Sequence, residues 1–171
     1  MDLDRTLGRL PLRLGGHNLY GADRVISTEV NMEVSEARKA LQNAPVFQGL
    51  DEAHLNTLAR AAHERSFSAG SKIVEEGETR GLGFWVILDG TVDVNKGGTT
   101  VNTLGPGEHF GEMALLSSLD TPRSADVVAK EPVRLLQLTR WDLRALIKDE
   151  PDIALAMMNA MMERLRKTVG D

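Results

Sequence analysis

Short strand-like segments separated by glycines are the feature that most narrows the fold of this chain. From residue 63 to residue 107 the sequence passes through stretches rich in β-branched and aromatic residues, such as "SKIVEEGE", "GFWVILDG" and "TVDVNKGG". Two further strand-like runs, "SADVVA" and "VRLLQLT", follow after residue 123. Short strands joined by closely spaced turns are typical of an antiparallel sandwich or barrel. Glycines stand where the chain has to reverse, at Gly70, Gly77, Gly90, Gly97, Gly98 and Gly105.

Helical patterns flank this strand-rich region on both sides. Residues 32–43 predict a short helix, and Asp51 has the side chain of an N-cap for a second helix that ends near residue 62. After the strands, residues 140–149 predict a short amphipathic helix. A longer one begins near Pro151, with acidic residues at its start and basic residues at its end. The expected fold class is therefore mainly β with flanking α: an eight-stranded antiparallel β-roll (jelly-roll) with N-terminal helices and a C-terminal helix pair.

The first thirty residues differ from the rest of the chain. Four leucines recur there at helical spacing, but Pro11 and the pair Gly15–Gly16 interrupt any long helix. We expect residues 1–30 to be an extension that is partly disordered, and residues 31–171 to form one domain. The leucines are Leu3, Leu7, Leu10 and Leu14.

Composition and charge exclude several classes of function. The 171 residues include no cysteine, so disulfides, thiolate metal sites and a cysteine nucleophile are impossible. A net charge of -5 does not favour nucleic-acid binding, and the chain ends just after the last predicted helix, without room for a helix-turn-helix. Its apolar runs fall well short of the roughly 20 residues that span a bilayer. We therefore expect a cytoplasmic protein with no membrane span and no direct contact with nucleic acid.

The stretch "GPGEHFGEMALLSSLDTPRSADVV" has the chemistry of a small anion site. Gly111 precedes a short helical pattern, and backbone N–H groups at a helix start that is reached through glycine favour an anion. Arg123 offers a fork of donors to a phosphate, and Ser124 and Ala125 are small enough to let their amides approach. Glu112 suits a hydroxyl, such as that of a ribose. These residues predict a sugar-phosphate site, with a surface Glu–Arg salt bridge as the alternative.

The segment "FGEMALL", followed by "PRSA", resembles the phosphate-binding cassette of the cyclic-nucleotide-binding domain family, F-G-E-(apolar)-A-L and then R-(S/T/A)-A. That family includes the catabolite activator proteins, the regulatory subunits of cyclic-AMP-dependent kinase and the cyclic-nucleotide-gated channels. The resemblance covers roughly residues 47–167, because "IVEEGE", "FWVILDGTVDV" and "LGPGEHFGE" are similar to the family's segments before the cassette. It implies a receptor for a cyclic nucleotide.

The resemblance also implies separate roles for individual residues. Glu112 would accept a hydrogen bond from the ribose 2′-hydroxyl, and Arg123 would pair with the cyclic phosphate. Ser124 favours cyclic AMP as the ligand over cyclic GMP, because a threonine there tends to serve guanine in the family. The gap between Glu112 and Arg123 is slightly longer than the family's common form. The phosphate cradle would be completed by Gly111, Met113, Ala114, Ser124 and Ala125.

The final helix and the strands are expected to enclose the rest of the nucleotide. In the family the last helix folds over the base, and we expect movement of that helix to carry the signal in this chain. The candidates for this lid are Met157, Met161 and Arg164. The candidates for the walls around the sugar and base are Val74, Val86 and Leu104.

Two other readings of the sequence stay open at this stage. One is a ligand-free dimerisation or protein-interaction module on the same fold, whose seam would include Met157, Met161 and Leu165 of the final helix. The other is the sensor half of a longer transcription regulator or channel.

A cupin-like enzyme would need clustered metal ligands, usually two histidines and a carboxylate. The four histidines form no His-x-His pair, and we interpret His109 as a loop histidine hydrated by solvent. We therefore expect neither a metal nor an enzymatic activity.

Overall fold

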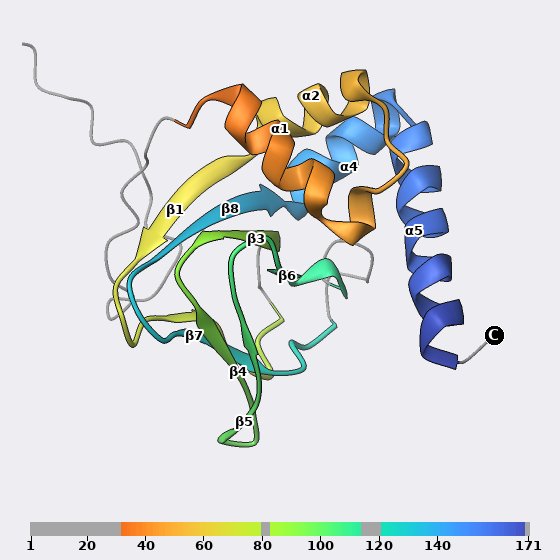
Figure 1. The fold of residues 1–171 in the computed structure, drawn as a ribbon. Coiled ribbons are helices and arrows are strands. Elements are labelled where there is room, and N and C mark those ends of the chain that lie inside the picture. Colours follow the sequence, from red (N-terminus) through yellow and green to blue (C-terminus); the bar gives the residue numbers. More distant parts are fainter. Residues whose placement is uncertain (1–31, 80–82, 114–120, 170–171) are drawn as a thin grey trace, which may run out of the picture.

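The computed structural model describes residues 32–79, 83–113 and 121–169, which form a β-roll with helices gathered at one end (Figure 1). The expected mainly-β fold with flanking helices is confirmed. Residues 1–30, for which we predicted an extension, lie outside the described ranges.

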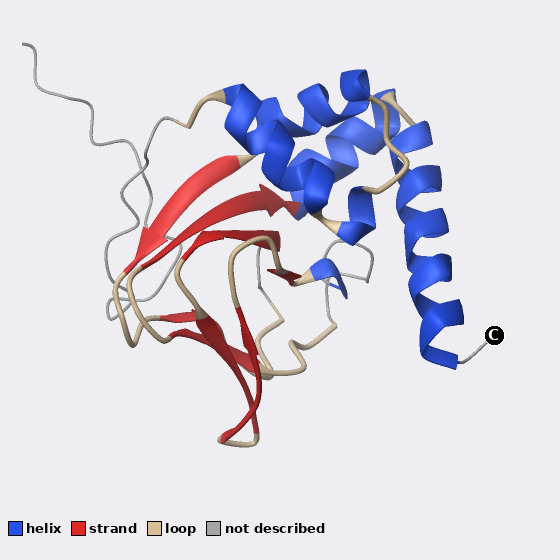
Figure 2. Ribbon diagram, in the orientation of Figure 1, coloured by secondary structure: helices blue, strands red, loops and turns tan. Residues whose placement is uncertain are grey.

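The eight strands of the described residues form two four-stranded antiparallel sheets, drawn in red in Figure 2. One sheet has the order β1-β8-β3-β6 and the other the order β2-β7-β4-β5. The two-residue β6 was not predicted, because so short a strand leaves no alternating pattern in a sequence. The bounds are β1 His63–Phe67, β2 Lys72–Val74, β3 Gly83–Asp89, β4 Val92–Lys96, β5 Thr99–Leu104, β6 His109–Phe110, β7 Asp126–Ala129 and β8 Val133–Thr139.

The helices pack together over one end of the β-roll, and α5 runs from them along its side (Figure 1). The side chain of Asp51 accepts a hydrogen bond from the backbone N–H of His54 at 2.9 Å, which confirms the predicted N-cap of α2. Thr139 caps α4 in the same way through the N–H of Asp142, at 3.1 Å. The bounds are α1 Val34–Asn43, the 3-10 helix η1 Pro45–Phe47, α2 Glu52–Ala61, α4 Arg140–Asp149 and α5 Asp152–Val169.

The sheet β1-β8-β3-β6 is buried on both faces. Along β3, Trp85 and Ile87 point into the β-roll, whereas Phe84 and Val86 pack against the helices. The side chains of β8 alternate in the same way, so successive residues of this strand belong to two separate cores. This sheet therefore fixes the position of the helices relative to the interior of the roll.

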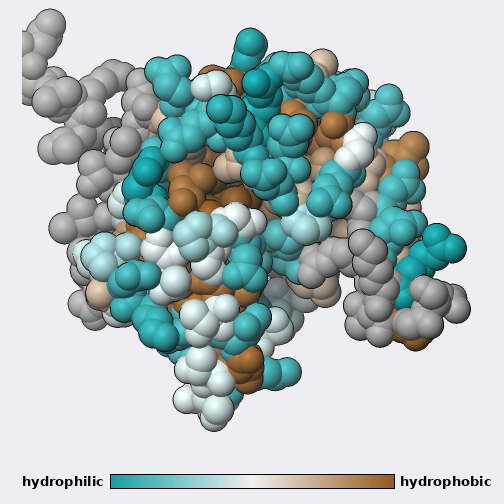
Figure 3. All heavy atoms as spheres, viewed as in Figure 1, coloured by the Kyte–Doolittle hydropathy of each residue, from teal (hydrophilic) through white to brown (hydrophobic). Residues whose placement is uncertain are grey.

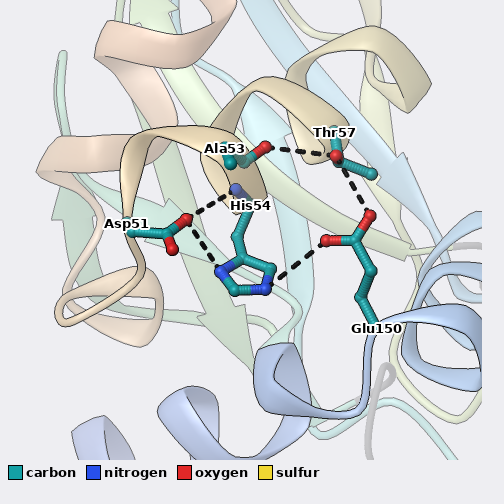
Figure 4. Close-up of polar contacts among 5 residues, drawn as sticks. All are labelled: Asp51, Ala53, His54, Thr57 and Glu150. Carbon is teal, nitrogen blue, oxygen red and sulfur yellow. Dashed lines mark hydrogen bonds and ion pairs between the residues drawn. The ribbon is translucent and has the colours of Figure 1, made fainter.

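A polar cluster joins α2 to the junction between α4 and α5 (Figure 4). The imidazole of His54 lies with Nδ1 2.8 Å from Asp51 and Nε2 3.5 Å from Glu150, which ends α4. The other carboxylate oxygen of Glu150 accepts a hydrogen bond from the Thr57 hydroxyl at 3.2 Å. The backbone N–H of His54, followed by its imidazole, holds the pKa of Asp51 below its usual value. The start of α5 is thus tied to α2 through side chains.

A buried ion pair lies between the neighbouring strands β1 and β8. The carboxylate of Glu64 is fully buried, and its Oε1 accepts a hydrogen bond from Nε of Arg134 at 2.6 Å. This hydrogen bond raises the pKa of the Arg134 guanidinium. The second oxygen of Glu64 has no hydrogen-bond partner among the described residues. Arg134 is therefore the partner that compensates for burial of this carboxylate.

Replacing Arg134 with methionine should lower the free energy of unfolding by roughly 3 kcal/mol, because it leaves a buried carboxylate without its charged partner. Chemical denaturation measures this difference. The matched control is Arg166→Met, which removes an exposed i,i+3 pair with Glu163 and should cost less than about 1 kcal/mol. Equal effects of the two substitutions would contradict a special role for the Glu64–Arg134 pair.

Candidate functional site

The loop before the cassette helix passes very close to the start of β3. β6 pairs with β3, with Phe110 opposite Trp85 and His109 opposite Val86. Gly111 follows with a φ of +85°, and a Cβ on it would lie 2.5 Å from the carbonyl oxygen of Gly83. Only glycine suits this combination of left-handed backbone and close approach. Helical structure begins at the next residue, so the amides after Gly111 lie at a helix start, as the sequence predicted.

Arg123 is held beside Gly111 through its own backbone. Its N–H donates to the carbonyl of Glu78, and its carbonyl accepts from the N–H of Gly77, both at 2.9 Å. The guanidinium then reaches across to β3, where Nη2 donates to the carbonyl of Gly83 at 3.4 Å. Nη1 lies 3.4 Å from the position that a Cβ on Gly111 would occupy. Two of the predicted cassette residues, distant in sequence, are therefore adjacent in space.

Glu112 lies one residue beyond Gly111 and is half-buried. Its Oε2 is 3.8 Å from Nδ1 of His109, in the same turn of chain. An acceptor carboxylate, a cationic fork and the amides of a helix start thus occur around one glycine. This combination can hold a phosphate and a neighbouring hydroxyl.

The remaining cassette residues differ in how much of each is exposed to solvent. Met113 is 64% exposed. Ser124 is also exposed, and Ala125 is half-buried. Ala114 lies outside the described residues, as does most of the longer gap between Glu112 and Arg123.

The predicted wall residues divide between the two cores. Val74 and Leu104 belong to the interior of the β-roll, together with Trp85 and Phe110. Val86 packs against the helices instead. The apolar run of β3 alone does not say which of its residues face the interior of the β-roll. The role of all three as wall residues stays a prediction.

The lid candidates lie on α5, whose inner face packs against the helical end of the molecule. Met157 is fully buried there and Met161 is half-buried beside it, in the same core as Phe47 of η1. The side chain of Arg164 lies outside the described residues. The lid role of all three stays a prediction.

His109 is a part of this region that the sequence reasoning missed. We expected a hydrated loop histidine, but it lies in β6 with a side chain only 8% exposed. It also borders a groove of about 770 Å³ between η1, the approach to β6 and α5, where Asn159 and Glu163 form part of the lining. A pairing of β6 with β3 could have revealed this burial, but β6 is too short to be recognised.

Comparison with known proteins identifies the domain. Residues 64–150, just over half of the chain, match the cyclic nucleotide-binding domain family. The chain belongs to this family. Domains of this family are typically regulatory and not catalytic.

Three relatives illustrate where such domains occur. A cAMP-dependent protein kinase regulatory subunit of Yarrowia lipolytica is 33% identical over 129 residues, which are 75% of this chain and 34% of the relative. A cyclic nucleotide-gated potassium channel of Mesorhizobium japonicum is 40% identical over 122 residues, 70% of this chain and 32% of the channel. Among solved structures, the regulatory domain of Toxoplasma gondii PKA with cAMP has a TM-score of 0.61 at 30% identity, and the match covers 68% of this chain and 45% of that one. The chain spans about a third of the length of these two curated relatives.

Two further findings concern residues 32–79, 83–113 and 121–169. No helix in these ranges is long and apolar enough to cross a membrane. Within the same ranges, histidine and carboxylate side chains do not gather in groups of three that could hold a metal ion.

Replacing Gly111 with alanine should lower the free energy of unfolding by about 2 kcal/mol or more, because it adds a steric clash to the strain of a positive φ. Gly107→Ala is the matched control, since Gly107 has a nearly equal φ of +84° but nothing within 4 Å of an added Cβ. Chemical denaturation should show the smaller loss for the control, near 1 kcal/mol. Equal losses would show that the close approach to Gly83 does not constrain the site.

Proposed function

We propose that this chain is a receptor that binds cyclic AMP in the cassette around Gly111 and has no catalytic activity of its own. The observation that supports this most is the placement of the Arg123 guanidinium beside Gly111, with Glu112 as the next residue. A cyclic nucleotide has one phosphate charge next to a ribose hydroxyl, which suits one guanidinium and one carboxylate.

Different residues of the cassette bind different parts of the nucleotide. Arg123 pairs with the cyclic phosphate through its planar fork of donors, and the amides near Gly111 take the remaining phosphate oxygens. Glu112 accepts a hydrogen bond from the ribose 2′-hydroxyl. Met113, Ala114, Ser124 and Ala125 complete the cradle.

Cyclic AMP is the proposed ligand, and cyclic GMP is the second choice. Ser124 stands where a threonine would favour guanine in the family. The solved relative from Toxoplasma gondii contains cAMP, which agrees with this choice for a chain of 30% identity.

The proposed signal is a shift of α5 against the β-roll when nucleotide binds. α5 packs against η1 and α4. Its first turn follows Glu150, which the cluster around His54 ties to α2. A helix that packs on its neighbours through one face can occupy two alternative positions. We also propose that residues 31–171 form the domain and residues 1–30 an extension of it.

Isothermal titration calorimetry tests the site. The wild type should bind cyclic AMP with micromolar or tighter affinity, and it should bind cyclic GMP more weakly. Arg123→Ala should lose roughly 2–5 kcal/mol of binding free energy, because the phosphate is left without its charged partner. The affinity of Arg123→Lys for cyclic AMP should lie between those of the wild type and Arg123→Ala, since lysine keeps the charge but not the planar fork.

Arg60→Ala is the control, because Arg60 lies exposed on α2 and should not affect binding. Cyclic AMP binding that is unchanged in Arg123→Ala would show that the site is elsewhere. If neither nucleotide binds the wild type, the ligand-free interaction module becomes the better account.

We also propose that two copies of the chain associate through α5. The supporting observation is a stripe of exposed apolar side chains on this helix, separate from its buried face. Figure 3 shows brown surface in places along the right-hand edge of the molecule, where α5 lies. Their spacing alternates between three and four residues, which is the repeat of a coiled-coil seam. The stripe consists of Leu155 (57% exposed), Met158 (59%), Met162 (57%), Leu165 (57%) and Val169 (74%). It replaces the seam of Met157, Met161 and Leu165 that we expected from the sequence, since Met157 is buried in its own molecule.

Light scattering coupled to size exclusion measures this association. The wild type should form a dimer at micromolar concentrations, and the double variant Met158→Glu, Leu165→Glu should be monomeric because it places charges on the seam. Val101→Glu is the control, since Val101 is similarly exposed (60%) but lies on β5. A monomeric wild type at high concentration would contradict the proposal.

A further inference from the structure

His109 lies in β6 and packs against one aromatic ring. Its neighbour Phe110 points into the β-roll, so His109 faces the helical side of the same sheet. The imidazole lies 5.3 Å from the ring of Phe84, with the planes 36° apart. Phe84 in turn meets Phe47 of η1 edge-on at 5.2 Å. The side chain of His109 is therefore buried beside an aromatic cluster and is only 8% exposed.

Its Nδ1 atom is buried without a hydrogen-bond partner in the described part of the chain. A buried polar atom that is left unpaired costs free energy, so native structures rarely contain one without a reason. The carboxylate oxygen Oε2 of Glu112 lies 3.8 Å away, which is too long for a hydrogen bond. A movement of about 1 Å by Glu112 would bring the two atoms to the distance of a charge-assisted bond.

We propose that His109 is a positioning residue for the ribose carboxylate. When nucleotide binds, the Nδ1–H of His109 donates to Oε2 of Glu112, and this leaves Oε1 directed at the ribose 2′-hydroxyl. The inference rests on the proposed cyclic-nucleotide function and adds a specificity determinant to it. A carboxylate held at one oxygen discriminates better between a ribose and a deoxyribose, because its other oxygen is already oriented.

Packing alone does not account for a histidine at this position. A phenylalanine would contact Phe84 equally well and would not bury an unpaired nitrogen. His109→Phe therefore keeps an aromatic ring and removes Nδ1 together with Nε2. This makes it the variant that separates positioning from packing.

The experiment compares the affinities of cyclic AMP and 2′-deoxy-cyclic AMP by calorimetry. The wild type should prefer cyclic AMP. His109→Phe should bind cyclic AMP about tenfold more weakly, as expected for loss of a hydrogen bond to a charged group, and 2′-deoxy-cyclic AMP with unchanged affinity. In a Glu112→Ala background, which leaves no acceptor for His109 to position, the same substitution should have no further effect. His63→Phe is the control, because His63 is exposed on β1.

A second measurement reports on the hydrogen bond itself. In protein labelled with ¹⁵N at histidine, the Nδ1 proton of His109 should become protected from exchange when cyclic AMP binds, but not when 2′-deoxy-cyclic AMP binds. Thermal unfolding of His109→Phe verifies that the variant is folded.

Each other outcome overturns the inference. Equal loss of affinity for the two ligands would make His109 a packing residue. A gain in cyclic AMP affinity would mean that it holds Glu112 away from the ligand. A wild type that binds neither nucleotide would overturn the receptor function and this inference with it. If the wild type binds cyclic AMP but His109→Phe has the same preference for cyclic AMP over 2′-deoxy-cyclic AMP, only the inference is overturned.

Discussion

Burial of the β1-β8-β3-β6 sheet on both faces is the constraint from which the arrangement of this molecule follows. Helices cover one face and the interior of the β-roll covers the other, so β3 and β8 must supply apolar side chains to two cores at once. Such a sheet cannot slide in register, because a shift of one residue would exchange the side chains of the two cores. The cassette begins at β6, the edge strand of this sheet. The pairing of β6 with β3 therefore fixes where the cassette starts.

The carbonyl of Gly83 is the point where the candidate site comes together. It accepts a hydrogen bond from the Arg123 guanidinium and leaves no room for a side chain on Gly111. Gly83 itself has no room for a Cβ, which would lie 2.4 Å from the carbonyl oxygen of Leu138 on β8. Close approach of the backbone thus helps to place the arginine beside the helix start.

Local patterns predicted much of this arrangement. The cap at Asp51, the helix over residues 140–149 and the roles suggested for Gly111 and Arg123 depend on residues near in sequence or on a recognisable motif. Features of the structure that depend on pairing between distant segments were harder to predict. β6 is too short to show a pattern, and so the burial of His109 was not seen. The separation of Val86 from Val74 and Leu104 into another core was also not predicted, because an apolar run does not show which residues face inward. On α5, helical spacing indicated an apolar face, but only the packing against η1 distinguishes buried Met157 from the exposed stripe.

The tie between His54 and Glu150 has a mechanical consequence for α5. With 18 residues, this helix is about 27 Å long at 1.5 Å per residue, and its side-chain anchor lies at one end. A rotation of ten degrees about Glu150 would carry the far end through about 5 Å, which is close to one helical turn. If α5 shifts on nucleotide binding as proposed, Glu150 would lie at the pivot, and a small rearrangement at the base of the helix would become a displacement large enough for another molecule to detect.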